Sequence, residues 1–468
     1  MIELGGVLAA TAALAAFTWR GWPTRGLVAA LAALAAGWFV GPAAARWSAG
    51  EVQTWNVFHY TVGSRFFGEL GYYDLYLGAL AADAAGDDHF GYIDTVRDLH
   101  TYRKVDRDLA LRHAPQLSPE RTAELQRVIG ALAPTLTERD WRDVFVDRGY
   151  NATPAYTAVA GPLAAGLPSE RAATRWASTW LDPLALAVGL AALGAAFGAE
   201  AAAWVVLLAA VFPGTQDRWL GAFLAYDWLA ACLVGLAATH RDRPGLAAAA
   251  FAWATASRLF PAALVASLLL PDLRTALRER RLPDFARVFV PTYAACLGAA
   301  GLLGCTTTRG PGAWAEFVPR FWFHSQQHAV GRQRIGLRHL LLGDTPDALR
   351  EATAHAQAGL WFALVAVGLA VWLVAAARSS RVEAAVLGFV PVFLVAVSSR
   401  YYWAGFALAG AAPGRGRVLA LGFLAASACG YGARAAGLDD VGRYVAIELA
   451  LGSTLALGVA LAATGDRR

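Results

Sequence analysis

The chain has 468 residues, of which 57% are hydrophobic and only 16% are charged, and its mean hydropathy is +0.42. Soluble domains carry about 25% charged residues, so this composition excludes an ordinary soluble protein and indicates a polytopic membrane protein. The formal net charge of +5 predicts no nucleic-acid partner, because the arginines lie mainly in short loops between apolar segments, where they face membrane lipids.

The first part of the chain predicts two spans followed by a large polar insertion. Arg20 and Arg25 separate the apolar windows 2–18 and 27–45, and basic residues in such a short loop predict that it faces the cytoplasm. Residues 46–153 then fall outside the membrane. Helical periodicity within this loop predicts a helical external subdomain inserted after the second span.

The rest of the chain alternates between apolar windows and short loops. The windows fall near 178–197, 201–213, 219–239, 287–305, 358–377, 383–399, 403–412, 418–436 and 443–463. Residues 306–345 form a second external loop, while 154–167 are too short and proline-rich for a comfortable span and favour an interfacial or re-entrant segment. Since a span needs roughly 20 apolar residues, we predict one all-α membrane domain over 1–468. It is a bundle of about 11–13 spans and half-spans.

Residues 246–270 are apolar but have basic loops on both sides. Two full spans need about 40 residues, so a hairpin of two half-helices reconciles the charges. Its tip falls at Ser257-Arg258-Leu259-Phe260-Pro261, with Pro261 in the first turn of the second half-helix. An interrupted helix at membrane depth lines a cavity or is buried in protein. Arg258 at this tip favours an anion-binding site for a lipid-linked phosphate, and snorkelling to a headgroup is the alternative.

Three carboxylates are candidates for a general base. Glu69 and Asp74 lie among the tyrosines Tyr73 and Tyr76, which favour a membrane interface, and Glu51 follows the second span. Transfer of a sugar from a lipid phosphate needs a carboxylate that takes a proton from the acceptor hydroxyl. It also needs cationic or dipolar groups that hold the departing phosphate. For each acid singly, an ordinary solvated loop residue is the alternative.

The second external loop gathers planar donors beside aromatic residues, and these suit both sugar hydroxyls and phosphate. They are His324, Gln326, Gln327, Arg332 and Arg334. A basic interfacial helix is the alternative. His324 and His328 are spaced as metal ligands on a helix, but no acidic ligand is near, so we predict no metal and no other cofactor. Asp227 lies inside an apolar window and must face a cavity or a partner, so a structural contact and a substrate contact both remain open.

Three motifs occur in a fixed order over about residues 27–270. The first runs from Asn56-Val57-Phe58-His59-Tyr60 to Gly71-Tyr72-Tyr73-Asp74-Leu75-Tyr76, the second is Tyr150-Asn151-Ala152-Thr153-Pro154-Ala155-Tyr156, and the third is the tip around Arg258. Together they resemble the C-type (GT-C fold) membrane glycosyltransferases, specifically the family 87 group of polyprenyl-phosphate-sugar-dependent, mannosyltransferase-like proteins. The segment Ser399-Arg400-Tyr401-Tyr402-Trp403 matches more loosely.

The resemblance implies an inverting enzyme of the bacterial inner membrane with an outward-facing site. It would move a sugar from a polyprenyl-phosphate donor to a lipid or glycan acceptor. The donor phosphate would be bound by Arg258, Arg332 and Arg334. Substrate contacts would come from His59, Tyr60, Tyr73, Tyr76, Asp227, His324, Gln326, Gln327, Arg400 and Tyr401.

The chain also departs from the pattern of this family. Asn56 stands where the family usually has a catalytic Asp, Arg258 stands where Lys is commoner, and a single Pro154 replaces a doubled proline. The alternative function is a transporter or flippase of a lipid-linked or anionic substrate. Such a protein is expected to repeat its broken helix in a second half, and no second Ser-Arg-x-x-Pro segment occurs in the sequence.

Overall fold

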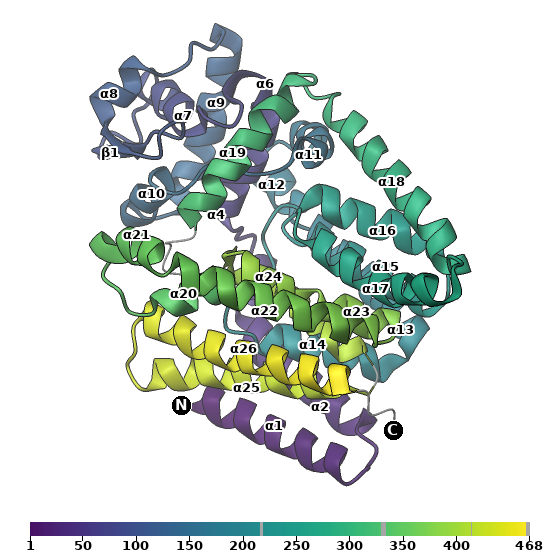
Figure 1. Cartoon of the computed structure of the whole chain (residues 1–468). Helices are drawn as coiled ribbons and strands as arrows, with labels where there is room; N and C mark the ends of the chain where they lie inside the picture. Colours follow the sequence, from purple (N-terminus) through teal and green to yellow (C-terminus); the bar gives the residue numbers. More distant parts are fainter. Residues whose placement is uncertain (216–218, 329–333, 413, 465–468) are drawn as a thin grey trace.

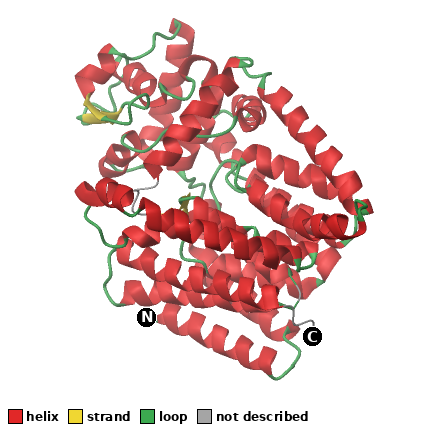
Figure 2. Ribbon diagram, in the orientation of Figure 1, coloured by secondary structure: helices red, strands yellow, loops and turns green. Residues whose placement is uncertain are grey.

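The computed structural model is almost entirely helical and describes residues 1–215, 219–328, 334–412 and 414–464 (Figure 2). The described strands form two short antiparallel pairs. β1 (Thr95–Arg97) pairs with β2 (Lys104–Asp106), and β3 (Arg334–Ile335) pairs with β4 (Ser398–Ser399). The predicted all-α class is therefore confirmed.

The helices fall into three groups along the chain. The first comprises α1 (Ile2–Trp19), α2 (Arg25–Ala35), η1 (Ala36–Val40), α3 (Gly41–Ser48), α4 (Thr54–Val57), η2 (Phe58–Val62), α5 (Gly63–Arg65), α6 (Phe67–Leu70), α7 (Leu75–Ala84), α8 (Arg107–Arg112), α9 (Pro119–Leu132), η3 (Ala133–Thr135) and α10 (Glu138–Phe145). The second comprises α11 (Pro154–Gly166), α12 (Ala172–Ser178), α13 (Leu181–Phe197), α14 (Ala199–Val211), α15 (Asp227–His240), α16 (Pro244–Ser257), α17 (Pro261–Glu279) and α18 (Asp284–Gly304). The third comprises α19 (Gly312–His328), α20 (Leu337–Leu342), α21 (Asp347–Ala356), α22 (Ala358–Ala377), α23 (Arg381–Leu387), α24 (Phe389–Val395), η4 (Arg400–Ala411), α25 (Gly416–Ala435) and α26 (Asp440–Thr464). Here η1 and η2 are π-helical, whereas η3 and η4 are 3₁₀-helical.

Seven helical segments within the described residues are long and apolar enough to cross a membrane, which agrees with the predicted polytopic membrane protein. They are Ile2–Trp19, Arg25–Ser48, Ala172–Phe197, Asp284–Gly304, Ala358–Ala377, Gly416–Ala435 and Asp440–Thr464. This number is lower than the predicted total of about 11–13 because that total also counted half-spans. The shorter apolar helices α14, α15 and α16 have 13, 14 and 14 residues.

Two predicted spans in the C-terminal third do not form continuous α-helices. The window 383–399 divides at Gly388 into α23 and α24, and a Cβ at this glycine would lie only 2.6 Å from the Cα of Leu264. The close approach of α17 thus requires glycine at the break. The window 403–412 folds as the 3₁₀ helix η4, which is almost completely buried. Its apolar composition reflects burial among other helices.

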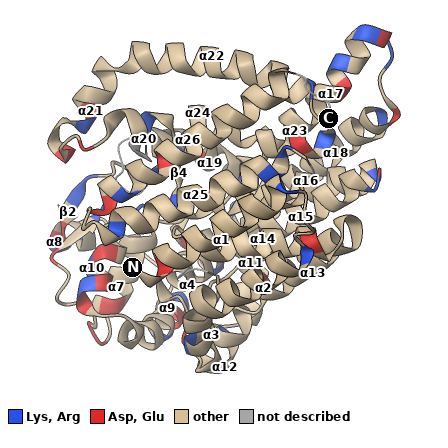
Figure 3. Ribbon diagram, turned by 90° about the horizontal axis from the view of Figure 1, so that it is seen from below, with Lys and Arg blue, Asp and Glu red and all other residues tan. Residues whose placement is uncertain are grey.

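The basic loops between the helices lie on one face of the bundle, at the right-hand end in Figure 1. Arg381 binds Asp272 at 2.8 Å and lies 3.7 Å from Asp242, which joins the middle of α17 to the loop that follows α15. Arg378, after α22, donates to the carbonyl of Ala463 in the last turn of α26. Figure 3 shows this concentration of Lys and Arg around the ends of α17, α18 and α23. This arrangement agrees with the alternation of loops inferred from arginine counting.

The chain has two hydrophobic cores. The larger one joins the apolar faces of the bundle from α1 to α26. The second is built mainly from residues between Val57 and Ala164, with Phe317 of α19 packed into it. This unit, α4–α11 with α19, is called the external unit because the sequence predicts that it lies outside the membrane. It lies at the upper left in Figure 1, at the opposite end from the basic loops. It therefore has its own hydrophobic core and is not a loop that packs only against the bundle.

Candidate functional site

Four segments that are distant in sequence meet where the two cores adjoin. Leu259, at the break between α16 and α17, packs against the external core, and its neighbour Phe260 packs against the bundle core. Thr153 caps α11 and donates to the carbonyl of Ala256 at 2.5 Å, which ties the second motif to this break. Tyr60 from η2 and Tyr402 from η4 complete the junction, since both are electrostatic neighbours of Arg258. Three motif regions singled out in the sequence, and the looser fourth, are thus adjacent in space.

Arg258 lies at the centre of this junction and is only 8% exposed. Its guanidinium carbon lies 4.7 Å from the ring centroid of Tyr156 and 5.3 Å from that of Tyr60, so it packs against two neighbouring aromatic rings whose centroids are 5.8 Å apart. Its Nη1 and Nη2 donate to the carbonyls of Ser257 and Leu224, at 3.0 and 3.3 Å. A buried guanidinium without an ion pair of 4 Å or less among the described contacts favours an anionic ligand.

The break that carries Arg258 occurs where the sequence predicts it. α16 ends at Ser257, and α17 begins with Pro261 at its first position. Proline is favoured there because its missing N–H would be unpaired in any case. The N-terminal end of α17, with its partial positive charge, therefore adjoins Arg258 and adds to the attraction of the junction for an anion.

Asp227, which opens α15, is the nearest buried acid to Arg258. Its Oδ2 accepts hydrogen bonds from Ser257 Oγ at 2.7 Å and Trp253 Nε1 at 3.1 Å. Within the part of the chain that the structure describes, its Oδ1 accepts none. A buried carboxylate oxygen without a donor is costly, so Asp227 offers an acceptor to a hydroxyl-bearing ligand in addition to its structural contacts.

The loop before Asp227 is shaped by two side chains from other elements. Asp182 of α13 accepts from the backbone N–H groups of Ala225 and Tyr226, at 2.7 and 2.9 Å. Asn56 accepts from the N–H of Phe223 at 2.7 Å. These bonds hold Leu224 at φ +47, a conformation rare for a branched side chain, with its carbonyl facing Arg258. Asn56 therefore has a structural contact at the position where the family usually has its catalytic Asp.

Asp147, in the loop after α10, is a carboxylate at the junction that is 38% exposed. Its Oδ2 accepts from the indole Nε1 of Trp55 at 2.9 Å and lies 3.9 Å from Nε2 of His59. Tyr60 is an electrostatic neighbour of both Asp147 and Arg258. A carboxylate and a guanidinium thus occur in the surroundings of the same tyrosine, and a transfer from a phosphate leaving group requires groups of these two kinds.

His59 is held firmly beside Asp147. Its Nδ1 lies 2.7 Å from the carbonyl of Trp55, and because a carbonyl only accepts, this nitrogen carries a proton. In the neutral ring, Nε2 then accepts from the hydroxyl of Tyr76 at 2.6 Å, and that hydroxyl accepts from the N–H of Gly149 at 2.9 Å. η2, which presents His59 and Tyr60, is a π-helical turn, a feature frequent at functional sites.

Arg334 and Arg148 give the external side of the junction an excess of positive charge. Burial and the charge of Arg148 lower the pKa of Arg334 to about 10, while Tyr401 and Asp147 oppose the shift. Burial, with Arg320, Arg334 and Arg148, also lowers the pKa of His324 well below its usual range. At neutral pH Arg334 stays protonated, so an anion entering here would relieve repulsion between like charges.

The three carboxylates predicted as candidate bases lie away from this cluster. Glu69 forms an ion pair with Arg121, Glu51 is exposed beside Arg46 at 3.8 Å, and Asp74 lies 3.4 Å from His100. Burial raises the pKa of Asp74, and His100 opposes the shift. Within the described part of the chain, no hydrogen bond or ion pair of these three acids involves Arg258 or Arg334. Their role as a base stays a prediction that this geometry does not favour.

The remaining residues predicted to contact substrate fall into two groups, one inside the junction and one at its rim or beyond it. Tyr401 adjoins Tyr60 and Arg334. Tyr73 is stacked on His100 with centroids 4.5 Å apart, His324 lies 2.5 Å from the hydroxyl of Tyr102, and Arg400 donates to Tyr444 at 2.9 Å. These last three therefore have contacts at the rim of the junction or beyond it. Arg332, and the side chains of Gln326 and Gln327, lie outside the described residues.

Sequence reasoning missed Asp147, Arg148, Tyr156 and Tyr402 as site residues. The signal was present for the first two, because Asp147-Arg148-Gly149 immediately precedes the motif that begins at Tyr150. A polar pair directly before a motif that enters the membrane is a reason to extend that motif. Tyr402 could not be identified from the sequence, because its role depends on the packing of η4 against the helix break.

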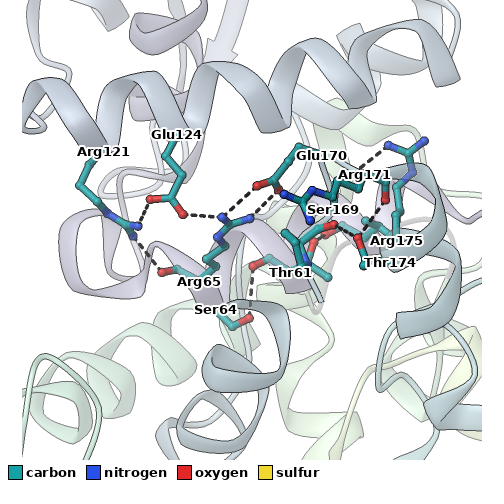
Figure 4. A network of polar contacts seen from close by, with 12 residues as sticks. Thr61, Ser64, Arg65, Arg121, Glu124, Ser169, Glu170, Arg171, Thr174 and Arg175 are labelled. Carbon is teal, nitrogen blue, oxygen red and sulfur yellow. Dashed lines mark hydrogen bonds and ion pairs between the residues drawn. The ribbon is translucent and has the colours of Figure 1, made fainter. Parts of the chain in front are cut away.

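An ion-pair network supports the helix that carries His59 and Tyr60 (Figure 4). Arg65, directly after this segment, binds Glu124 of α9 at 2.5 Å and Glu170 at 2.7 Å. Arg121 links Glu124 to Glu69 in the same network. The network joins α5, α9 and the segment before α12, so it fixes the external unit against the bundle close to the site.

Comparisons of the chain with family models, with curated proteins and with solved structures give no match. Among the described residues, no group of three or more His, Cys, Asp and Glu side chains is placed to hold a metal ion. The functional argument therefore rests on the residues of the junction.

Proposed function

We propose that this protein is an integral-membrane glycosyltransferase. It transfers a sugar from a polyprenyl-phosphate donor to a lipid or glycan acceptor, with inversion, at the external face of a bacterial inner membrane. The observation that carries the proposal is that the half-exposed carboxylate of Asp147 and the buried guanidinium of Arg258 both act electrostatically on Tyr60, against whose ring Arg258 packs. A GT-C-like bundle with its external unit above the site is the fold that this function implies.

In the proposed reaction Asp147 is the general base. It takes the proton from the acceptor hydroxyl as the hydroxyl oxygen forms a bond to the anomeric carbon. The bond from that carbon to the phosphate oxygen breaks, and its electron pair leaves with the polyprenyl phosphate. Because attack and departure occur on opposite sides of the sugar, the configuration inverts. His59 and Trp55 orient the carboxylate.

The departing phosphate gains negative charge, and Arg258 is the group best placed to hold it. Its planar guanidinium has five donors and is pre-oriented by the tyrosine rings on its faces. Arg334 and Arg148 supply further positive charge from the external side. Asp227 Oδ1 offers an acceptor for a sugar hydroxyl. Since the guanidinium groups are fixed before the substrate arrives, they stabilise charge with little reorganisation.

The proposal is tested by sugar transfer in proteoliposomes that contain the purified protein, radiolabelled polyprenyl-phosphate sugars and an extract of host lipids and glycans. We expect Asp147→Asn to lower the rate by about 10²–10⁴-fold, the usual contribution of a general base. Glu69→Gln and Asp74→Asn serve as matched controls and should lose less than tenfold.

Transfer by wild-type protein that survives Asp147→Asn but is lost in a control variant would assign the base elsewhere. If folded wild-type protein forms no product from any intact donor, the enzymatic proposal fails. The transporter or flippase would then be tested by following movement of a fluorescent lipid-linked phosphate across the vesicle membrane.

A further inference from the structure

We infer that a second anion site, on the basic face opposite the external unit, binds the phosphate headgroup of an anionic membrane lipid. The site is a cavity of about 250 Å³ between the second half of α17 and the end of α22. Arg274 and Arg278 line it from α17, and Arg378 lines it from the turn after α22. The inference is independent of the proposed transfer reaction.

The charge of the cavity favours a phosphate. Among the described residues that line it, three arginines and one acid, Glu279, leave an excess of positive charge. Arg278 has no hydrogen-bond or ion-pair partner among the described residues and is exposed. Arg274 and Arg378 each donate to a carbonyl, of Ala377 and Ala463, in the last turn of a neighbouring helix. One such bond uses one of the five N–H donors of a guanidinium.

Capping of helix carboxyl ends accounts for two of these arginines, since basic residues satisfy the last carbonyls. It does not account for Arg278, which lies one turn after Arg274 on the same side of α17. The cavity also adjoins Thr275, whose hydroxyl is a further possible ligand for a phosphate oxygen. The arrangement is that of a basic pocket between membrane helices, which recognises anionic lipid headgroups.

Exposed leucines beside the cavity favour a lipid over a free phosphate. Leu273 and Leu277 of α17 are 51% and 74% exposed and are one turn apart. Leu373 and Val374, in the last turns of the candidate span α22, are 45% and 46% exposed. Apolar surface therefore lies next to the arginines on both helices. A phosphate in the cavity would place attached acyl chains along these residues, whereas a soluble phosphate would gain nothing from them.

The site is tested on the full-length protein by native mass spectrometry with phosphatidylglycerol, phosphatidylcholine and soluble glycerol phosphate. Each surface arginine near anionic lipid contributes a factor of about five in affinity. We therefore expect Arg278→Gln to weaken phosphatidylglycerol binding about fivefold and Arg278→Gln/Arg378→Gln about thirtyfold. Arg281→Gln, on the same basic loop but outside the cavity, is the matched control and should bind like wild type.

Four results would overturn the inference. Retention of phosphatidylglycerol by the double variant at the wild-type level would exclude the cavity. Equal weakening by Arg281→Gln would indicate only a general attraction to the basic face. Equal binding of phosphatidylcholine, or displacement of the lipid by glycerol phosphate at equal concentration, would exclude an anionic lipid as the ligand. Because Arg278 is exposed, its single variant is expected to fold and keeps the test valid if the double variant does not.

Discussion

The indole of Trp55 donates a hydrogen bond to Asp147 at 2.9 Å and thereby joins α4 to the loop after α10, 92 residues later in the chain. This contact orients a carboxylate that remains 38% exposed. A carboxylate that is fixed yet accessible suits a general base, because little reorganisation is needed when substrate arrives. The same indole is stacked with His59, so the three side chains form one unit.

This unit predicts the effect of Trp55→Phe. Phenylalanine keeps an aromatic ring at the position but removes the donor, so Asp147 loses its orientation while the packing survives. We expect the rate of sugar transfer to fall about tenfold, the equivalent of one hydrogen bond. The rate is measured at saturating donor in proteoliposomes. Trp176→Phe removes an indole bond to the carbonyl of Trp47 away from the junction and is the control. Equal losses in the two variants would refute a special role for Trp55.

Arg258→Lys tests whether the guanidinium is needed or only its charge. Lysine keeps the positive charge but lacks the planar group that packs against the rings of Tyr60 and Tyr156. We expect kcat/KM to fall about 100-fold, through weaker binding of the leaving phosphate in the transition state. Arg142→Lys, which alters an exposed arginine over the ring of Tyr92, is the matched control. An unchanged kcat/KM in Arg258→Lys would reduce Arg258 to a structural residue.

Sequence patterns predicted the helical class and the break before Pro261 that carries Arg258, whereas the anion-binding role of Arg258 stays a prediction. An arginine inside an apolar window is informative because burying its charge is costly, so the side chain must face a cavity, a polar partner or the membrane interface. Sequence patterns did not identify Asp147, since the choice among several loop acids depends on which one faces the break. Glu69 and Asp74 fit the aromatic pattern equally well, and their partners Arg121 and His100 lie far away in sequence. Local patterns do not reveal such long-range pairs.

Glu170→Gln is expected to loosen the external unit in a pH-dependent way (Figure 4). Burial acts to raise the pKa of Glu170, but the hydrogen bonds and charge of Arg65, a backbone hydrogen bond and the charge of Arg127 together outweigh it, so the pKa is lowered on folding. A lowered pKa adds stability above the ordinary value of about 4.3, and this stability is lost as pH falls through the folded value. We expect the variant to lose about 2 kcal/mol near pH 7.

The difference between wild type and Glu170→Gln should then shrink below about pH 4. Unfolding in urea, followed by tryptophan fluorescence to which the buried Trp141 contributes, gives the free energy of unfolding of both proteins at each pH. A difference that stays constant between pH 7 and pH 3 would contradict the assignment of the effect to the charge of Glu170. Glu138→Gln, which alters an exposed acid on α10 of the same unit, controls for the general effect of removing one negative charge.

Glu448 of α26 and His339 of α20 form a fully buried pair inside the bundle, with Nδ1 of His339 2.9 Å from Oε2 of Glu448. The same carboxylate accepts from the N–H of Gly336 at 2.9 Å, and Gly336 directly follows β3, which carries Arg334. Removing one partner leaves a buried polar group, so Glu448→Leu is expected to cost about 3–5 kcal/mol.

The double variant His339→Leu/Glu448→Leu should recover much of this loss, because well-packed apolar side chains replace a buried pair at little cost. Thermal unfolding in detergent measures both variants. Transfer activity should stay low in the double variant even when stability returns, since Gly336 and therefore β3 have lost their anchor. Recovery of both stability and activity would show that the pair has no part in positioning Arg334, whereas a double variant as unstable as Glu448→Leu would contradict the energetic argument.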